Sequence, residues 1–169
     1  MTLLNQDFFA QDAITVAKSC IGATMVIHGQ QALILETEAY LGTDDPASHA
    51  YRGRTPKNTL MFNEPGFAYL YWMYGRYIGF NMVTCPTGTP GSVFLRQIKI
   101  GDKLINGPGK LTQALGITMN DQGMPLFNPK GTHLIASTLH DQQAIIARPR
   151  IGIKHAQSKL LRFTLNNPA

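Results

Sequence analysis

Apolar residues near the start of the chain recur with the spacing of a helix. Those between positions 8 and 21 fall near one helical face, Asp7 can cap the first turn, and Gly22 can end the last one. This pattern predicts one helix that runs from Asp7 to about Cys20.

Two strands are predicted next, at residues 23–27 and 31–40, and the second has two unlike sides. Successive side chains of a strand point in opposite directions. One side should pack on a core, because it carries Leu33, Leu35, Thr37 and Ala39. The other side carries two carboxylates and a phenol, in the order Ile34, Glu36, Glu38 and Tyr40. We expect this second side to carry the chemistry.

A long loop and a hairpin follow. Residues 42–65 are rich in Asp, Pro, Ser, Gly and Asn, which predicts a loop with at most a short helix. A loop of this length in a compact domain is more often functional than idle. Residues 66–74 and 76–84 predict the two strands of a hairpin with Tyr74 and Gly75 at its tip, where Gly75 supplies the positive φ of a tight turn.

The remaining pattern predicts a strand at residues 92–100, a short helix at 108–115, and then short strands and turns. Antiparallel hairpins dominate this order of elements. We therefore expect a single domain over residues 1–169, of mixed α/β class, with a curved antiparallel β-sheet core, surrounding helices and a protruding β-hairpin. A chain of 169 residues can bury a core without disulfides or metals.

The charge of the sequence suggests a polyanionic partner. The sequence carries 15 Lys and Arg residues against 10 Asp and Glu residues, a net charge of +5. One basic group lies in the predicted loop, at Arg52, Arg54 and Lys57. Another follows the last acidic residue, at Arg148, Arg150, Lys154, Lys159 and Arg162. Such groups suit the phosphates of a nucleic acid, although a solvated basic face without a partner fits them equally well.

No segment of the sequence suggests export or membrane insertion. Asp7 and Asp12 argue against a signal peptide, and the most apolar stretch, residues 67–83, is too interrupted for a membrane span. Cys20 and Cys85 lack the spacing of a zinc site and suit reduced, buried thiols. We expect an intracellular monomer that is not secreted, cytoplasmic in a bacterium or nuclear in a eukaryote, without metal or cofactor.

Glu38 is the candidate catalytic residue that the strand pattern offers. A glutamate on the polar side of a half-buried strand can act as a general base toward water. Partial burial beside Glu36 would raise the pKa of Glu38 toward neutral pH. A carboxylate that merely faces solvent fits the same spacing.

Aromatic residues crowd the predicted hairpin. Tyr69, Tyr71 and Tyr77 fit either a pocket wall or ordinary core packing. Tyr74 at the tip has little core to enter, so it either faces solvent or wedges into a partner, as some side chains do between base steps of DNA. Three further polar residues stand alone in the pattern: His49, Asn81 and Arg96. Each of them either meets a local structural need, faces solvent or lines a pocket.

Motifs of several common enzyme classes are absent. The sequence has no GxxxxGK[ST] loop, no GxGxxG after a strand, no HExxH and no GxSxG. Phosphate-loop, nicotinamide, zincin and α/β-hydrolase functions therefore lose their main support.

Short motifs in one consistent order extend over nearly the whole chain. The run Glu-Thr-Glu-Ala-Tyr-Leu-Gly at residues 36–42 is followed by Asp45, His49, Arg52-Gly53, Thr55-Pro56-Lys57-Asn58 and Met61-Phe62. Further blocks are Pro65-Gly66, Tyr69-Leu70-Tyr71, Tyr74-Gly75, Tyr77, Asn81, Val93-Phe94-Leu95-Arg96, Gly107-Pro108-Gly109-Lys110-Leu111, Arg150-Ile151-Gly152-Ile153 and Leu161-Arg162-Phe163. Together they resemble the signature of the alkyladenine DNA glycosylases, also called 3-methyladenine or N-methylpurine-DNA glycosylases.

The resemblance implies a monofunctional DNA glycosylase of base excision repair. Such an enzyme binds double-stranded DNA and flips an alkylated or deaminated purine of the 3-methyladenine, 7-methylguanine, hypoxanthine and ethenoadenine class. It then hydrolyses the N-glycosidic bond to leave an abasic site. The motifs match Glu38 to the general base, Arg96 to the arginine that helps to hold the catalytic water, and Tyr74 to the tyrosine inserted into the minor groove. They match the base pocket to Tyr40, His49, Tyr71 and Asn81, of which the last disfavours guanine.

The resemblance also gives the basic groups a role, because Arg52, Arg54, Lys57 and the C-terminal basic residues would hold phosphates without reading sequence. Arg76 departs from the family, in which we expect an apolar side chain beside the inserted tyrosine. Two other functions fit the same residues. One is a non-catalytic binder of damaged or single-stranded nucleic acid, and the other is a small-molecule hydrolase with Glu38 as its base.

Overall fold

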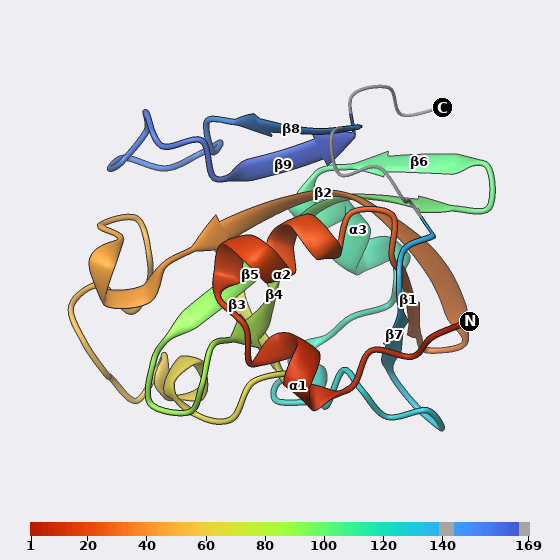
Figure 1. Cartoon of the computed structure of the whole chain (residues 1–169), viewed down its shortest axis with the longest axis horizontal. Coiled ribbons are helices and arrows are strands. Elements are labelled where there is room, and N and C mark those ends of the chain that lie inside the picture. The colour runs from red at the N-terminus through yellow and green to blue at the C-terminus, as the bar shows by residue number, and fades with distance from the viewer. Residues whose placement is uncertain (139–143, 166–169) are drawn as a thin grey trace.

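One open sheet of antiparallel strands organises the protein (Figure 1). The computed structural model describes residues 1–138 and 144–165, and nine strands form within them. They are β1 (Thr24–Ile27), β2 (Gln30–Tyr40), β3 (Ala68–Met73), β4 (Tyr77–Thr84), β5 (Gly91–Ile100), β6 (Lys103–Asn106), β7 (His133–Ile135), β8 (Ile145–Arg148) and β9 (Arg162–Leu165). The main order is β3-β4-β5-β2-β1-β7, with β6 paired to β5, β9 to β2, and β8 to β9.

Short helices flank the sheet. They are α1 (Gln6–Phe9), α2 (Ala13–Ser19), α3 (Pro108–Ala114) and the 3-10 helices η1 (Gly42–Asp44), η2 (Thr59–Phe62) and η3 (Met119–Asp121). Helix α2 packs against β2 and β5, whereas α3 packs against β4, β5 and β6. The long strand β2 bends as it crosses the molecule (Figure 1). The predicted mixed α/β class with a curved antiparallel sheet is therefore confirmed. No helix in the described part of the chain is long and apolar enough to cross a membrane.

The single helix predicted at the start of the chain is wrong, because two helices form there. Asn5 caps α1 by accepting a hydrogen bond from the backbone N–H of Phe8. Asp12 caps α2 by accepting from the N–H groups of Ile14 and Thr15. A side chain that binds the free N–H groups of a first turn favours a new helix start, so Asp12 divides one apolar pattern into two helices. The other predicted strands and the helix at 108–115 form close to their predicted ends.

A β-bulge in β2 corrects the predicted assignment of its two sides. The pairing of β2 with β5 shifts register between Ile34 and Glu36 and again between Glu36 and Thr37. A bulge turns the following side chains to the opposite side of the strand. The core therefore receives Ala32 and Ile34 before the bulge and, as predicted, Ala39 after it, whereas Leu33 is only partly buried. Leu35 is buried as predicted, although it lies outside the main cluster. The predicted grouping of Glu36, Glu38 and Tyr40 lies after Ile34 and stays intact.

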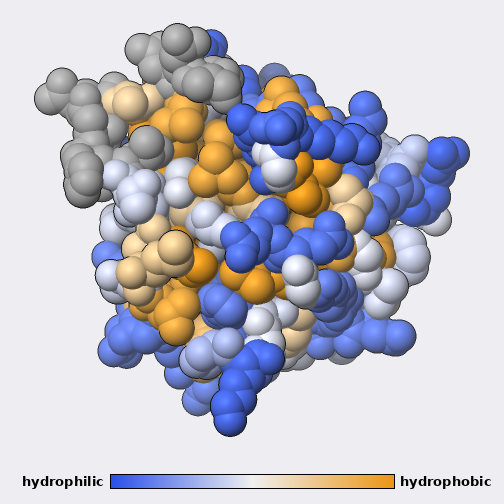
Figure 2. Space-filling view, turned by 90° about the vertical axis from the view of Figure 1, so that its right-hand side faces the viewer, coloured by the Kyte–Doolittle hydropathy of each residue, from blue (hydrophilic) through white to orange (hydrophobic). Residues whose placement is uncertain are grey.

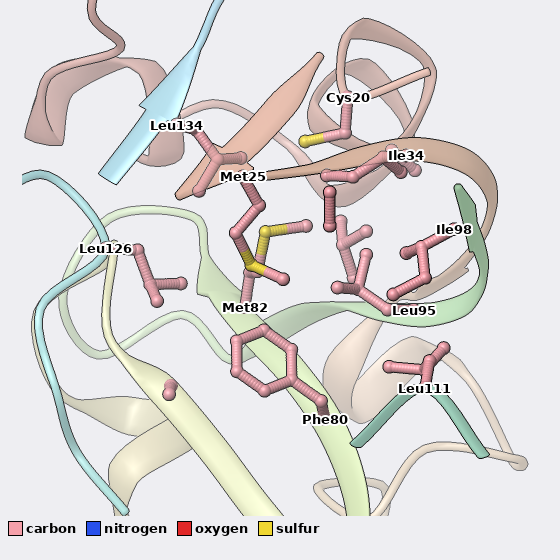
Figure 3. Close-up of a cluster of buried hydrophobic side chains, with 14 of the residues drawn as sticks. Cys20, Met25, Ile34, Phe80, Met82, Leu95, Ile98, Leu111, Leu126 and Leu134 are labelled. Carbon is pink, nitrogen blue, oxygen red and sulfur yellow. The ribbon is translucent and has the colours of Figure 1, made fainter. Parts of the chain in front are cut away.

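The core is built from the helices and from most strands of the sheet. It includes Cys20, Met25, Ile34, Phe80, Met82, Leu95, Ile98, Leu111, Leu126 and Leu134 (Figure 3). Burial raises the pKa of the Cys20 thiol, whereas Cys85 is only partly buried, so the prediction of two buried thiols holds for Cys20 alone. On the face at the right of Figure 1, hydrophobic residues lie in separate areas between hydrophilic ones (Figure 2).

Replacement of a core leucine tests how much this packing stabilises the fold. Leu95 on β5 is fully buried, so we expect Leu95→Ala to lower the free energy of unfolding by about 2–5 kcal/mol through lost burial and a cavity. Leu104 on β6 is 53% exposed, and the same change there should cost less than about 0.5 kcal/mol. Urea denaturation of both variants measures the difference, and equal losses would contradict the assignment of the core.

Candidate active site

A pocket of about 420 Å³ opens where seven segments of the chain meet. They are the end of β2, the loop between η1 and η2, η2 itself, the β3–β4 hairpin, strand β5, the start of α3 and the segment at residues 151–153. The residues that line it are Tyr40, His49, Met61, Tyr69, Tyr71, Met73, Tyr74, Asn81, Ser92, Phe94, Arg96, Pro108, Ile151, Gly152 and Ile153. The structure thus brings together the predicted pocket residues Tyr40, His49, Tyr71 and Asn81.

Tyr71 is the central ring of an aromatic wall. Its ring centre lies 4.4 Å from that of His49 and 6.1 Å from that of Phe94. Gly79, opposite Tyr71 on β4, makes this position available, because a Cβ atom there would lie only 2.9 Å from atoms of the Tyr71 ring. Burial raises the pKa of Tyr71, so its phenol stays neutral. No pattern in the sequence indicated a role for Gly79 or Phe94.

His49 is held in the pocket wall by Tyr69 on β3 and by its own loop. Its Nδ1 lies 3.0 Å from the hydroxyl of Tyr69. The buried Asn58 donates from Nδ2 to the backbone oxygens of His49 (2.8 Å) and Gly53 (3.0 Å). These two bonds fix the loop that carries His49. Burial lowers the pKa of His49, so the ring is neutral near pH 7. Asn58 is therefore a positioning residue. The sequence pattern did not single it out, because it lies among other polar residues of a loop.

Glu38 is fully buried behind the pocket wall, so the solvent-facing alternative is wrong. Its Oε2 accepts from the Tyr40 hydroxyl at 2.9 Å, and its Oε1 accepts from the Ile151 backbone N–H at 2.8 Å. Burial raises the pKa of Glu38 above its ordinary value, although Arg96, the Ile151 N–H and the Tyr40 hydroxyl all act to lower it. The contacts Tyr40, Arg96 and Ile151 themselves line the pocket. A carboxylate with a raised pKa so close to a cavity suits proton transfer.

Arg96 is shared between two carboxylates. Its Nε lies 3.1 Å from Glu36 Oε1 and 3.5 Å from Glu38 Oε1. The side chain is mostly buried and also lines the pocket. The guanidinium therefore neutralises charge at the polar side of β2 and presents part of itself to the cavity.

Asn81 and Ser92 form a polar patch among the pocket residues. The Ser92 hydroxyl donates to Asn81 Oδ1 at 3.3 Å, and Asn81 Nδ2 donates to the backbone oxygen of Tyr69 at 3.4 Å. Both side chains are buried. These bonds orient the amide of Asn81, and nothing in the sequence pattern indicated that Ser92 is its partner.

The hairpin tip projects Tyr74 outward. This side chain is 85% exposed, and its backbone has a positive φ of 51°, followed by 73° at Gly75. A bulky residue with a positive φ is uncommon, and such strain often marks a functional position. Arg76 beside it lies over the ring of Tyr77 and donates to the Tyr77 hydroxyl at 2.8 Å. The tip therefore offers one free aromatic side chain.

The basic residues do not all serve the same surface. Arg52, Arg54 and Lys57 are exposed on one loop, although Arg54 also donates to Thr59 and Asn63. Arg150 is only 5% exposed, so the expectation that it holds a phosphate is wrong. Burial of this charge is possible because an acidic partner is buried with it.

That partner is Asp45, and the buried pair lies next to two residues of the pocket wall, Tyr40 and Ile151. Arg150 binds both carboxylate oxygens of Asp45, with Nη2 to Oδ1 at 2.8 Å, and donates from Nη1 to the backbone oxygen of Ala39. Its guanidinium also lies 4.6 Å from the ring centre of Tyr40. The pair fixes the segment that places the next residue, Ile151, on Glu38.

Known proteins resemble the chain along nearly its whole length. Residues 7–169 match the model of the family described as methylpurine-DNA glycosylase. A relative from Ehrlichia chaffeensis (strain Arkansas) is 38% identical over 96% of this chain and 93% of its own. One from Sodalis glossinidius is 39% identical over 96% of each chain, and one from Rhodopseudomonas palustris is 40% identical over 98% of this chain and 85% of its own. All three carry the provisional name 3-methyladenine DNA glycosylase.

Asp45→Asn tests the buried pair. Burial alone would raise the pKa of Asp45, but the bonds from Arg150 and the Leu41 N–H outweigh it and lower the pKa below 3.8. At about pH 7 we expect the variant to lose about 3–5 kcal/mol of unfolding free energy, because Arg150 stays buried without its partner. The stability that the wild-type chain gains from Asp45 is complete above the ordinary pKa of 3.8 and disappears as the pH falls through the lowered one. Urea denaturation of the wild-type chain and the variant at about pH 7 and about pH 3 measures this loss. If the difference in unfolding free energy between the two proteins is as large in acid as at neutral pH, the stabilising role of ionised Asp45 is contradicted.

Proposed function

The chain belongs to the methylpurine-DNA glycosylase family, and we propose that it is a monofunctional member that excises alkylated or deaminated purines from double-stranded DNA. Enzymes of this family are hydrolases of N-glycosyl bonds in DNA repair. The lesions that we expect are 3-methyladenine, 7-methylguanine, hypoxanthine and ethenoadenine. One observation carries the proposal: the buried carboxylate of Glu38 is bonded to residues that line a pocket rich in aromatic rings.

DNA would first meet the surface around the pocket mouth. The exposed side chains of Arg52, Arg54, Lys57 and Lys154 would hold phosphates without reading the base sequence. Tyr74 would enter the space that the flipped nucleotide leaves. Extrusion costs a few kcal/mol, and less where damage has weakened base pairing. Each aromatic stack contributes about 1–3 kcal/mol, enough to make the flipped state accessible.

The pocket would favour a base that alkylation has made cationic. Electron-rich ring faces attract a cation, and Tyr40, His49 and Tyr71 supply such faces. The lowered pKa of His49 keeps its ring neutral, so it does not repel a positive guest. Asn81, oriented by Ser92, would disfavour the exocyclic amino group of a normal guanine.

Glu38 would act as the general base. It would take a proton from a water molecule while the water oxygen bonds to the anomeric carbon and the bond from that carbon to the purine nitrogen breaks. The bonding electrons leave with the purine, so a cationic base departs neutral. A neutral base such as hypoxanthine departs as an anion and takes up a proton from solvent water. We expect the water to lie where Arg96 and Ile151 meet the cavity, because both contact Glu38 and both line the pocket. General-base catalysis contributes about 10²–10⁴-fold.

Several features support this proposal over its rivals. None of the pocket-lining residues in the described part of the chain is a lysine, which supports simple hydrolysis over an amine nucleophile and strand cleavage. A non-catalytic binder would gain nothing from a buried charge, whose desolvation costs stability. The hydrolysis as written needs no metal or cofactor. We further propose one domain acting as a monomer, because the strands form one sheet around one main core.

Glu38→Gln tests the base. With a duplex that carries one hypoxanthine or 3-methyladenine, and with chelator present, we expect the native protein to produce an abasic site. The variant should lose about 10²-fold or more in rate while it still binds the duplex. Glu64→Gln is the matched control, because Glu64 is exposed and lies outside the pocket. Native binding without base release would favour the binder, and release from small substrates alone would favour the small-molecule hydrolase.

Tyr74→Ser tests the wedge. We expect its rate to fall about tenfold or more on a paired lesion, because the flipped state loses the stacking of one aromatic ring. A lesion in a single-stranded oligonucleotide needs no such support, so the rate there should change little. Single-turnover rates on the two substrates measure the contrast. If both rates fall equally, Tyr74 has another role.

A further inference from the structure

Glu36 is a buried carboxylate that the proposed hydrolysis does not use. Its side chain is 11% exposed and lies two residues before Glu38 on the same side of β2. Its Oε1 is closer to Arg96 Nε, at 3.1 Å, than Glu38 Oε1 is, at 3.5 Å. Of the two carboxylates, Glu36 therefore holds the arginine more firmly.

Glu36 has a second cationic partner. Its other oxygen, Oε2, lies 3.3 Å from Nη1 of Arg162 on β9. Arg162 lies opposite Glu38 in the register of β9 and β2, and it donates from Nε to the backbone oxygen of Pro149. The side chains thus form a row of alternating charge, Arg162, Glu36, Arg96 and Glu38, that ends at the pocket wall.

We propose that Glu36 is a positioning residue that holds Arg96 partly away from Glu38, and that Arg162 weakens this hold by competing for Glu36. The inference rests on the proposed function in treating Glu38 as the base. The charged and titratable groups around Glu38 are Glu36 and Tyr40 on β2, Tyr71 on β3, Arg96 on β5, Arg150 after β8 and Arg162 on β9. Of these, Glu36 is the one whose charge both repels that of Glu38 and draws Arg96 from it.

The row predicts opposite effects at its two outer positions. Glu36→Gln removes a negative charge beside Glu38 and frees Arg96 to move closer to it. Both changes favour the ionised form, so the pKa of Glu38 should fall. Arg162→Gln removes a positive charge near Glu38 and leaves Glu36 to bind Arg96 alone. Both changes disfavour the ionised form, so the pKa of Glu38 should rise. General loosening of the structure would not produce shifts of opposite sign.

Titration of Glu38 in the free full-length chain tests this without any substrate. Glutamate carboxyl carbons are labelled with ¹³C, and the signal of Glu38 is identified by its loss in Glu38→Gln. We expect the pKa of Glu38 to fall by about one unit in Glu36→Gln and to rise in Arg162→Gln. Arg162→Lys keeps the charge and should restore a value near that of the native chain, whereas Glu64→Gln should leave it unchanged. Shifts of the same sign, or no shift in Glu36→Gln, would overturn the inference.

The acid limb of kcat/KM on a lesion-bearing duplex gives a second readout. It should move to lower pH in Glu36→Gln and to higher pH in Arg162→Gln, since this limb reports the base in the free enzyme. A chain that released no base would refute the proposed function, while the titration would still decide the role of Glu36. If the acid limb stayed at the same pH in both variants, the role of Glu36 in positioning Arg96 would be overturned.

Discussion

The structure of the site depends on holding one carboxylate, that of Glu38, out of water. Transfer of an ionised group from water is costly unless partners and hydrogen bonds compensate. Glu38 receives a phenol, a backbone N–H and part of a guanidinium, from three segments far apart in the sequence. These partners lower its pKa, while burial raises it and dominates. The result is a carboxylate that is a stronger base than one in solvent and that is held in one position.

The same requirement explains why residues outside the pocket matter. Ile151 can donate to Glu38 only if its segment is fixed, and the buried pair of Asp45 and Arg150 fixes it. The β-bulge at Glu36 has a similar role, because it lets one strand send Ile34 into the core and still direct Glu36 and Glu38 to the polar side. Stability and chemistry therefore share these elements, and damage to either partner of the buried pair should affect both.

Local patterns in the sequence predicted much of the sheet, whereas the members of the pocket came from the resemblance to a known family. Period-two alternation identified β2 and its polar side, and the match to the glycosylase motifs identified Tyr40, His49, Tyr71 and Asn81. The bulge was not predicted, because alternation assumes a regular strand. The two-helix start was missed because the capping by Asp12 competes with a continuous apolar pattern. Arg150 was assigned to DNA, since charge in a sequence does not reveal a buried partner more than one hundred residues away. The Ile151 N–H was not identified either, because every residue but proline has one.

The most direct measurement is a crystal structure of the Glu38→Gln variant bound to a duplex with one hypoxanthine. We expect the hypoxanthine to lie outside the base stack, in the pocket formed by Tyr40, His49 and Tyr71. The anomeric carbon of the sugar that carries it should face position 38 across a single ordered water. A base that stays paired in the duplex, or one that enters the pocket with its anomeric carbon turned away from position 38, would contradict this view of the site.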